Sequence, residues 1–338
     1  MADATATTRK DWQSDQEVRW CPGCGDYSIL AAVQLMLAEV GARPENTVFV
    51  SGIGCASRFP YYMNTYGFHG IHGRAPAIAT GLAMARPDLD VWVIGGDGDL
   101  LSIGGNHLIH ALRRNVNITI LLFNNQIYGL TKGQVSPTSE RGKLTKSTPF
   151  GSLEKPFNPI SLALGAEATF VARTHDMDRA HMMEMFRRAR EHKGSAFVEV
   201  YQNCNVFNDG AFDPLTAKDR RDDMLIPLRH GEPVKFGANG DKGVVIDKDG
   251  TARVVSVAEV GEDAIHVHDE TAELSVAFAL SRLSSGPTEP TPIGVFRAVQ
   301  DPEYGEAVSA QIAEAVERRG PGELRKLLTS GATWEVAG

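Results

Sequence analysis

The first two hundred residues alternate between short, continuous apolar runs and longer segments whose apolar residues recur at helical spacing. Short apolar runs are typical of buried strands, and recurrence near every third or fourth residue is typical of helices. The runs that predict strands are residues 47–51, 91–96, 117–123, 168–173 and 196–202. The segments that predict helices are residues 27–40, 75–85, 103–115 and 176–193. This alternation favours an α/β fold, a doubly wound and mostly parallel sheet with helices on both faces.

Glycine, polar and cysteine residues follow four of the predicted strands directly. In a doubly wound sheet, ligands bind beyond the carboxyl ends of the strands, which lie at one edge. The first strand continues into Gly52–Cys55, the second into Gly96–Asp99, the third into Asn124–Asn125 and the last into Asn203–Cys204. We therefore expect thiolates and an Asp/Asn pair to be neighbours in space.

The pattern weakens beyond about residue 210. Residues 229–259 are rich in turn residues, 284–292 predict a loop, and 268–283 and 307–328 predict helices. We predict three parts: a flexible N-terminal tail (1–16), an α/β domain (17–215) and a C-terminal extension (216–338) that covers the core or contacts a partner.

Composition excludes several classes of function. Hydrophobic residues make up 42% and charged residues 22% of the 338-residue chain, as in ordinary globular proteins. The net charge of −8 disfavours nucleic acid or an anionic membrane as the main partner. The apolar runs are too short to span a bilayer, and the polar N-terminus carries no secretory signal. We expect a soluble, cytoplasmic protein.

Four cysteines are the most distinctive chemical feature of the chain. Cys21 and Cys24 form a CPGC motif, Cys55 ends SGIGC, and Cys204 follows the last predicted strand. Four thiolates around one point are the ligand set of an iron–sulfur cluster or a structural zinc ion. Disulfides or free thiols are the alternative, and disulfides are rare in intracellular chains of this length.

The second and third strands end in groups suited to a hard cation. Asp97 offers a carboxylate, Asn125 an amide oxygen and Ile127 a backbone carbonyl. Mg²⁺ prefers such oxygen ligands and usually also binds phosphate oxygens of a substrate. The glycines around Asp97 let the backbone approach a diphosphate, and a helix beginning near Ser102 would direct its N-terminus at the same anion.

Other ligands fit these motifs less well. Gly52-Ile53-Gly54 begins like a dinucleotide fingerprint, but the third glycine is absent. GDGD begins like a calcium loop, but no Glu stands at its twelfth position. His107 and His110 have a metal-ligand spacing on a predicted helix but no further ligands beside them, so we interpret them as packing and surface residues.

In combination, the motifs resemble those of the β subunits of 2-oxoacid:ferredoxin oxidoreductases, in particular the 2-oxoglutarate branch. GDG and NN begin and end a thiamine diphosphate motif, and CPGCGDYSIL, SGIGC, HGRAPAIATGLAMARPD and FNNQIYGLTKGQVSPTS occur in the family's order over roughly residues 15–215. The resemblance implies a fold of the thiamine-diphosphate-binding type. It also implies Mg²⁺ on Asp97, Asn125 and Ile127, and a 4Fe-4S cluster on Cys21, Cys24, Cys55 and Cys204. The cofactor-binding residues that it implies are Ser51, Gly52, Ile53, Gly54, Cys55, His72, Gly96, Asp97, Gly98, Asp99, Asn125, Tyr128, Gly129 and Leu130.

The implied activity is oxidative decarboxylation of 2-oxoglutarate with coenzyme A to succinyl-CoA and CO₂. Thiamine would act as the electron sink, and the cluster would pass electrons to ferredoxin. The chain shows no motif for the Glu that activates thiamine, so the resemblance implies a separate α (or fused α/γ) subunit, in an (αβ)2 assembly. The open alternatives are pyruvate or another 2-oxoacid as substrate, a non-redox thiamine decarboxylase subunit with structural zinc, and a non-enzymatic iron–sulfur electron carrier or assembly subunit.

Three further residues are candidates for substrate or cofactor contacts. His72 in HGRAP lines the active site by family resemblance, and the alternative is a structural histidine bonded to backbone. Arg74 beside it could bind a carboxylate or phosphate, or form a surface ion pair. Lys132 follows the NN motif and is predicted to pair with the distal carboxylate of 2-oxoglutarate, which pyruvate lacks; the alternative is a solvated surface lysine.

Overall fold

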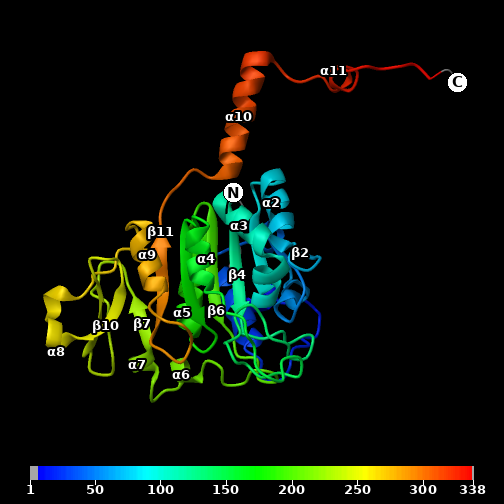
Figure 1. The fold of residues 1–338 in the computed structure, drawn as a ribbon. Helices are drawn as coiled ribbons and strands as arrows, with labels where there is room; N and C mark the ends of the chain where they lie inside the picture. The colour runs from blue at the N-terminus through cyan, green and yellow to red at the C-terminus, as the bar shows by residue number, and fades with distance from the viewer. Residues whose placement is uncertain (1–6, 337–338) are drawn as a thin grey trace.

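The structure, a computed structural model, describes residues 7–336 and is built on one eight-stranded sheet (Figure 1). The strand order is β2-β1-β3-β4-β6-β5-β11-β7. The six strands from β2 to β5 pair in parallel, β11 runs antiparallel to β5, and β7 runs parallel to β11. The predicted fold class, a doubly wound and mostly parallel sheet, is confirmed.

The strands of the main sheet are β1 (Thr47–Ser51), β2 (Tyr66–His69), β3 (Asp90–Gly96), β4 (Ile118–Asn124), β5 (Phe170–His175), β6 (Ser195–Tyr201), β7 (Leu225–Leu228) and β11 (Thr291–Ala298). The larger helices are α1 (Asp26–Glu39), α2 (Ala75–Ala85), α3 (Gly105–Arg113), α4 (Pro159–Gly165), α5 (Arg179–Glu191), α9 (Leu274–Ser281) and α10 (Tyr304–Arg319). The short helices are α6 (Asp213–Thr216), α7 (Arg221–Met224), α8 (Val257–Val260) and α11 (Leu324–Leu328).

Helices cover both faces of the sheet and enclose two hydrophobic cores. Successive side chains of a strand point to opposite faces. Val48 and Val50 of β1 therefore pack in the core beneath α2, α3, α4 and α9. Phe49, between them, packs with Trp92 and the residues of α1 and α5 in the other core. Because both faces are covered, these strands read as continuous apolar runs in the sequence.

The helix predicted over residues 103–115 begins later than expected. Asp99–Ile103 forms a single π-helical turn, and the backbone of Ser102 leaves helical geometry there, with φ −93° and ψ −109°. The regular helix α3 starts at Gly105. Helical backbone therefore follows β3 directly, at Gly98 and the π-helical turn, and the break at Ser102 separates this turn from α3.

The expected N-terminal tail packs on the domain over its described part. Arg9–Trp12 form a 3₁₀ turn in which the Trp12 side chain is fully buried. The carbonyl of Trp12 accepts a hydrogen bond from the backbone N–H of Asn64, at 3.0 Å. Residues 1–6 lie outside the described part, so the expected flexible tail can be compared with the structure only over 7–16.

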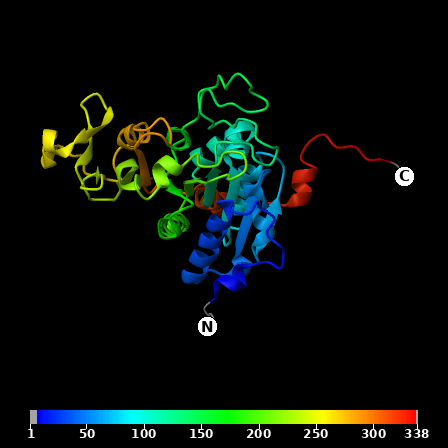
Figure 2. The same cartoon turned by 90° about the horizontal axis from the view of Figure 1, so that it is seen from below.

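Part of the expected C-terminal extension belongs to the main sheet. Strands β7 and β11 come from this part of the chain and complete the main sheet, so the expected boundary at residue 215 falls within the sheet. A small antiparallel sheet, β8 (Lys235–Phe236), β9 (Lys242–Ile246) and β10 (Ala252–Ser256), lies beside it. Helix α10 projects from the body in Figure 1 and is seen nearly end-on in Figure 2, and it buries none of its side chains. No helix within residues 7–336 has the length and apolar character needed to cross a membrane.

Candidate active site

A cavity of about 450 Å³ lies at the carboxyl ends of β1, β3 and β4, where the sequence predicted a site. The predicted residues that line it are Ile53, Gly54, Cys55, His72, Gly96, Asp97, Gly98, Asp99, Asn125, Ile127, Tyr128, Gly129 and Leu130. Ala56, Thr131 and Gln134 also line it and were missed by the sequence reasoning. We call this space the cofactor cavity.

Two predicted cofactor residues stand behind the cavity wall rather than on it. The hydroxyl of Ser51 donates to the backbone carbonyl of Ser57 at 2.7 Å, and its side chain is fully buried. Gly52 packs against Asp99 so closely that an added Cβ would lie 2.1 Å from Asp99 Oδ2. These residues therefore support the wall that Ile53 and Gly54 form.

Asp97 is a buried carboxylate on the cavity wall. Its side chain is 2% exposed, and its Oδ2 accepts hydrogen bonds from the hydroxyls of Ser136 and Thr138. Burial raises the pKa of Asp97 to about 6, although these hydrogen bonds oppose the shift. No lysine, arginine or histidine within the described chain forms an ion pair with it. The Asp97 carboxylate therefore lacks a positive partner at a cavity wall.

The two asparagines after β4 have different surroundings. Asn124 turns into the interior, where its Nδ2 donates to Glu199 Oε1 at 2.7 Å. Asn125 lines the cofactor cavity, its Oδ1 accepts from the backbone N–H of Ile127 at 3.1 Å, and its Nδ2 donates to Gln202 at 2.9 Å. The turn that follows is held with Gln126 at a positive φ of 57°. This turn brings Ile127 to the same cavity.

Asp99 joins two loops that form one side of the cavity. Its Oδ1 accepts from Nδ1 of His72 at 2.5 Å, from the N–H of Gly73 at 2.7 Å and from the N–H of Ile53 at 3.0 Å. The carboxylate can only accept, so Nδ1 of His72 carries the hydrogen in this contact. Nε2 of His72 is then left for a ligand in the cavity. The structure therefore gives Asp99 a positioning role.

Gly98 makes room for an aromatic ring. An added Cβ on Gly98 would lie 2.2 Å from Cε1 of Tyr128, and the Tyr128 hydroxyl donates to the carbonyl of Gly98 at 3.0 Å. From the sequence, glycine was expected here so that the backbone could approach a diphosphate. In the structure, this glycine also lets Tyr128 close over the loop. Gly96 has no such close neighbour. A Cβ added to Gly96 would lie 3.9 Å from the nearest atom, the backbone oxygen of Phe123.

The four cysteines meet in a second, smaller space. A pocket of about 220 Å³ is lined by Cys21, Cys24, Cys55 and Cys204, which we call the cysteine pocket. All four are free thiols in the structure. The sulfurs of Cys204 and Cys55 lie 3.4 and 3.7 Å from where a Cβ on Gly129 would stand. The residues that the sequence placed at one sheet edge are brought together here.

The environment of these thiols disfavours their anionic form. Burial, with a contribution from the Asp26 charge, raises the pKa of Cys24 far above the usual thiol range. The same causes, with Cys204 adding to them, raise the pKa of Cys55 to about 12. Four thiolates would be stable in this pocket only with a cationic group among them.

Within residues 7–336, no three His, Cys, Asp or Glu side chains converge closely enough to hold one metal ion.

The remaining candidates lie outside the cofactor cavity. Lys132 lines the cysteine pocket, and its backbone has a positive φ of 76°. Arg74 points its guanidinium to the backbone carbonyls of His72 and Ile103, each at 3.3 Å. His107 and His110 lie on α3, away from both spaces.

Comparison with known proteins agrees with the site. Residues 52–200, which include Asp97 and Asn125, match the family model of the thiamine pyrophosphate enzyme C-terminal TPP-binding domain. The chain is 59% identical to the 2-oxoglutarate oxidoreductase subunit KorB of Mycobacterium tuberculosis, over 97% of this chain and 88% of that protein. The chain belongs to the family of 2-oxoglutarate oxidoreductase β subunits.

Two other relatives support the same family. The 2-oxoacid:ferredoxin oxidoreductase 1 β subunit of Aeropyrum pernix is 51% identical over 56% of this chain and 60% of its own length. A solved structure of 2-oxoglutarate:ferredoxin oxidoreductase from Magnetococcus marinus, with 2-oxoglutarate, coenzyme A and succinyl-CoA bound, superposes with a TM-score of 0.77. It is 33% identical and covers 98% of both chains. The family predicted from the motifs is confirmed, and so is the thiamine-diphosphate-binding fold.

Proposed function

We propose that this chain is the cofactor-bearing subunit of a 2-oxoglutarate:ferredoxin oxidoreductase that forms succinyl-CoA and CO₂ with coenzyme A. The observation that carries the proposal is the wall shared by the two spaces. Cys55, Asn125, Gly129 and Leu130 line both the cofactor cavity and the cysteine pocket. Groups bound on its two sides would lie within a short electron-transfer distance of each other.

Thiamine diphosphate with Mg²⁺ fits the cofactor cavity. Asp97 is a buried carboxylate without a positive partner, which a divalent cation would supply. Asn125 and the carbonyl of Ile127 would complete the protein ligands from the turn after β4. When bound, thiamine supplies the electron sink that decarboxylation of a 2-oxoacid requires. Asp99 would hold the loops of Ile53 and His72 against it.

A 4Fe-4S cluster fits the cysteine pocket. The pocket has room for a polynuclear group among Cys21, Cys24, Cys55 and Cys204, and iron would supply the positive charge that their thiolates lack. Gln202 Nε2 lies 3.3 Å from the Cys24 sulfur, the kind of hydrogen bond that tunes a cluster's potential. A bound cluster supplies one-electron transfer toward ferredoxin. Structural zinc in the same pocket is the competing assignment, and it would be redox-silent; it would require the sulfurs to close around a single ion, more tightly than they lie in the described chain.

We assign His72 and Lys132 to the reaction. His72 would hold or release a proton at Nε2, because Asp99 fixes its other nitrogen as a donor. Lys132 stands at the pocket next to the shared wall and would attract the distal carboxylate of 2-oxoglutarate. These two roles predict separate defects, one in chemistry and one in substrate choice.

The C-terminal helices are the proposed contact with a partner α subunit in an (αβ)2 assembly. Helix α10 exposes Ile312 and Val316 one turn apart, and α11 exposes Leu324, Leu327 and Leu328. Apolar side chains gathered on helices without a packing partner mark interaction surfaces. The α subunit would supply the missing acidic residue that activates thiamine.

Asp97→Ala tests the assignment of the two spaces. We expect the variant, co-purified anaerobically with its partner subunit, to lose thiamine diphosphate binding while keeping the iron–sulfur absorption. Asp88→Ala is the matched control, because Asp88 is an exposed carboxylate paired with Arg86. Loss of both cofactors in the Asp97 variant alone would contradict the separation of the two sites.

A further inference from the structure

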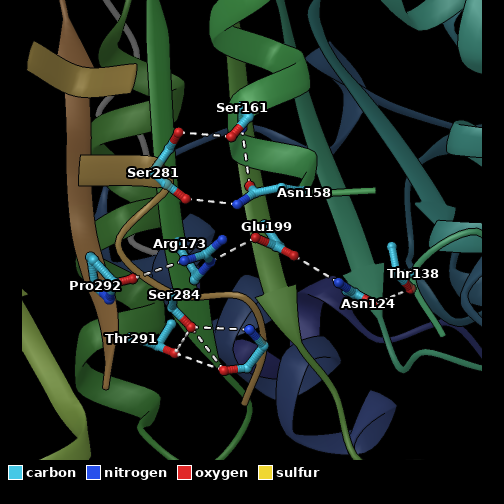
Figure 3. Close-up of polar contacts among 11 residues, drawn as sticks. Asn124, Thr138, Asn158, Ser161, Arg173, Glu199, Ser281, Ser284, Thr291 and Pro292 are labelled. Carbon is cyan, nitrogen blue, oxygen red and sulfur yellow. Dashed lines mark hydrogen bonds and ion pairs between the residues drawn. The ribbon is translucent and has the colours of Figure 1, made fainter. Parts of the chain in front are cut away.

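A third cavity, of about 260 Å³, lies at the carboxyl ends of β4, β5 and β6 and shares no lining residue with the cofactor cavity. Arg173, Glu199 and Tyr201 contribute to it from the strands, and Lys155, Arg282 and Ser285 from two loops. Figure 3 shows the polar contacts around Arg173 and Glu199 in this region. The proposed function uses none of these residues.

Arg173 has a buried guanidinium group, and not all of its N–H donors are used. Its side chain is 3% exposed, its Nε donates to Glu199 Oε2 at 2.7 Å, and its Nη1 donates to the carbonyl of Pro292 at 3.1 Å (Figure 3). The rings of Tyr201 and Phe296 lie 5.1 and 5.5 Å from its central carbon. Nη2 has no hydrogen-bond partner in the described chain. A guanidinium carries five N–H donors, so donors of Arg173 stay free beside the cavity.

The charges around the cavity favour an anion. Lys155 and Arg282 line it and form no ion pair within the part of the chain that the structure describes. Glu199 is balanced by Arg173, and Glu140, the other acid of the lining, lies 3.4 Å from Lys143. Two unpaired cations and a buried guanidinium therefore face the same small space.

A chain of hydrogen bonds joins this cavity to Asp97. Glu199 Oε1 accepts from Asn124 Nδ2 at 2.7 Å, and Asn124 Oδ1 accepts from the Thr138 hydroxyl at 2.9 Å (Figure 3). The same hydroxyl also lies 2.5 Å from Asp97 Oδ2. A threonine hydroxyl has one hydrogen to donate, so Asn124 and Asp97 compete for it. A shift of this hydrogen from one acceptor to the other would link the two sites.

We propose that this cavity is an oxyanion site, for a small phosphate or carboxylate, and that its occupant is coupled to Asp97 through Glu199, Asn124 and Thr138. An anion bound to Nη2 of Arg173 would weaken the ion pair between Arg173 and Glu199. Glu199 would then bind Asn124 more strongly, and the polarised Asn124 oxygen would draw the Thr138 hydrogen away from Asp97. Asp97 would be freer to bind a cation. The coupling part of this inference rests on the proposed role of Asp97.

The sign and size of the coupling follow from one hydrogen bond. Releasing one neutral donor from a carboxylate corresponds to about a fivefold change in affinity. We expect a saturating oxyanion to strengthen Mg²⁺ binding by about fivefold, and Mg²⁺ to strengthen oxyanion binding by the same factor. An anion that competes for the diphosphate position in the cofactor cavity would have the opposite effect.

The test uses the complex with its partner subunit, stripped of thiamine and Mg²⁺. Equilibrium dialysis with radiolabelled inorganic phosphate measures binding directly, and unlabelled succinate as competitor distinguishes a phosphate site from a carboxylate site. Mg²⁺ titrations at saturating thiamine diphosphate, followed by calorimetry with and without phosphate at equal ionic strength, measure the coupling. Neither readout depends on turnover.

Surface and interior variants separate the two parts of the proposal. Arg282→Ala, at an exposed position, should weaken phosphate binding about fivefold, whereas Arg220→Ala, an exposed arginine outside the cavity, should not change it. Thr138→Val should remove the effect of phosphate on Mg²⁺, measured at a phosphate concentration that saturates the variant because Thr138 also lines the cavity, and Thr138→Ser should restore the effect.

Phosphate binding that is absent, or that Arg282→Ala leaves unchanged, would overturn the oxyanion site. Phosphate that binds in the cavity but leaves Mg²⁺ affinity unchanged, or lowers it, would overturn the coupling. The role of Asp97 is checked independently. If Asp97→Ala kept the Mg²⁺ affinity of the wild type, the proposed function would fail, while the direct phosphate measurement would still decide the oxyanion site.

Discussion

Asp99→Asn probes how the cavity wall is held together. The carboxylate of Asp99 is 2% exposed and binds three donors through one oxygen, namely Nδ1 of His72 and the N–H groups of Gly73 and Ile53. Asparagine has the same shape and keeps an acceptor oxygen, but it loses the negative charge. The substitution therefore changes the strength of the contacts more than their number.

The magnitude follows from these three contacts. Hydrogen bonds to a charged group contribute about 1.5–3 kcal/mol, and neutral ones about 1 kcal/mol, so three weakened bonds cost about 3 kcal/mol. The other oxygen, Oδ2, is buried without a partner in the described chain, so the amide N–H₂ placed there would find no acceptor. We expect the melting temperature to fall by about 5 °C and thiamine diphosphate affinity to fall tenfold or more, as when outer-sphere positioning groups are removed.

Thermal unfolding of the stripped complex by circular dichroism and calorimetric titration of thiamine diphosphate measure both effects. Asp88→Asn serves as the control and should lie within about 0.5 kcal/mol of the wild type, because Asp88 is exposed. An Asp99→Asn variant with wild-type melting and wild-type thiamine affinity would refute the positioning role.

Three further predictions concern other parts of the site and the core. Gly98→Ala should displace the Tyr128 ring and destabilise the protein by about 1–3 kcal/mol, measured by urea unfolding, because the new Cβ would stand 2.2 Å from that ring; unchanged stability would contradict the packing. Lys132→Ala should lower the preference for 2-oxoglutarate over pyruvate about tenfold in a ferredoxin-reduction assay, and an unchanged ratio would remove Lys132 from substrate selection. Burial lowers the pKa of His192 to about 4, below its unfolded value of about 6.5, so this neutral histidine stabilises the fold above pH 6.5. That stability is lost as the pH falls from about 6.5 toward 4. His192→Gln should therefore flatten the dependence of the unfolding free energy on pH in this range. A pH dependence identical to that of the wild type would contradict this role of His192.

The positions of the central strands, and the proximity of the site residues at one edge of the sheet, were predictable for a physical reason. Strands β1 and β4 are buried on both faces, so they read as unbroken apolar runs. Once the strands were placed, the shared carboxyl edge put Cys55, Asp97, Asn125 and Cys204 together without knowledge of the loops. This part of the prediction depended only on local pattern and on a general property of parallel sheets.

Other features depend on tertiary contacts that local patterns do not record. Ser136 and Thr138 reach Asp97 from a long polar segment without helical or strand periodicity, so no signal placed them there. Strand β11 follows a proline-rich loop and joins the sheet by pairing with β5, far away in the sequence. Arg173 and Glu199 are directly paired between β5 and β6, and the register that pairs them appears only once the sheet is formed.

Electron transfer across the wall shared by the cofactor cavity and the cysteine pocket is the most direct test of the proposed function. The complex is prepared anaerobically with thiamine diphosphate and Mg²⁺, and its visible absorption is recorded before and after 2-oxoglutarate and coenzyme A are added. We expect an iron–sulfur absorption that bleaches on addition and recovers when oxidised ferredoxin is supplied. A complex that decarboxylates 2-oxoglutarate while this absorption stays absent or unchanged would contradict it.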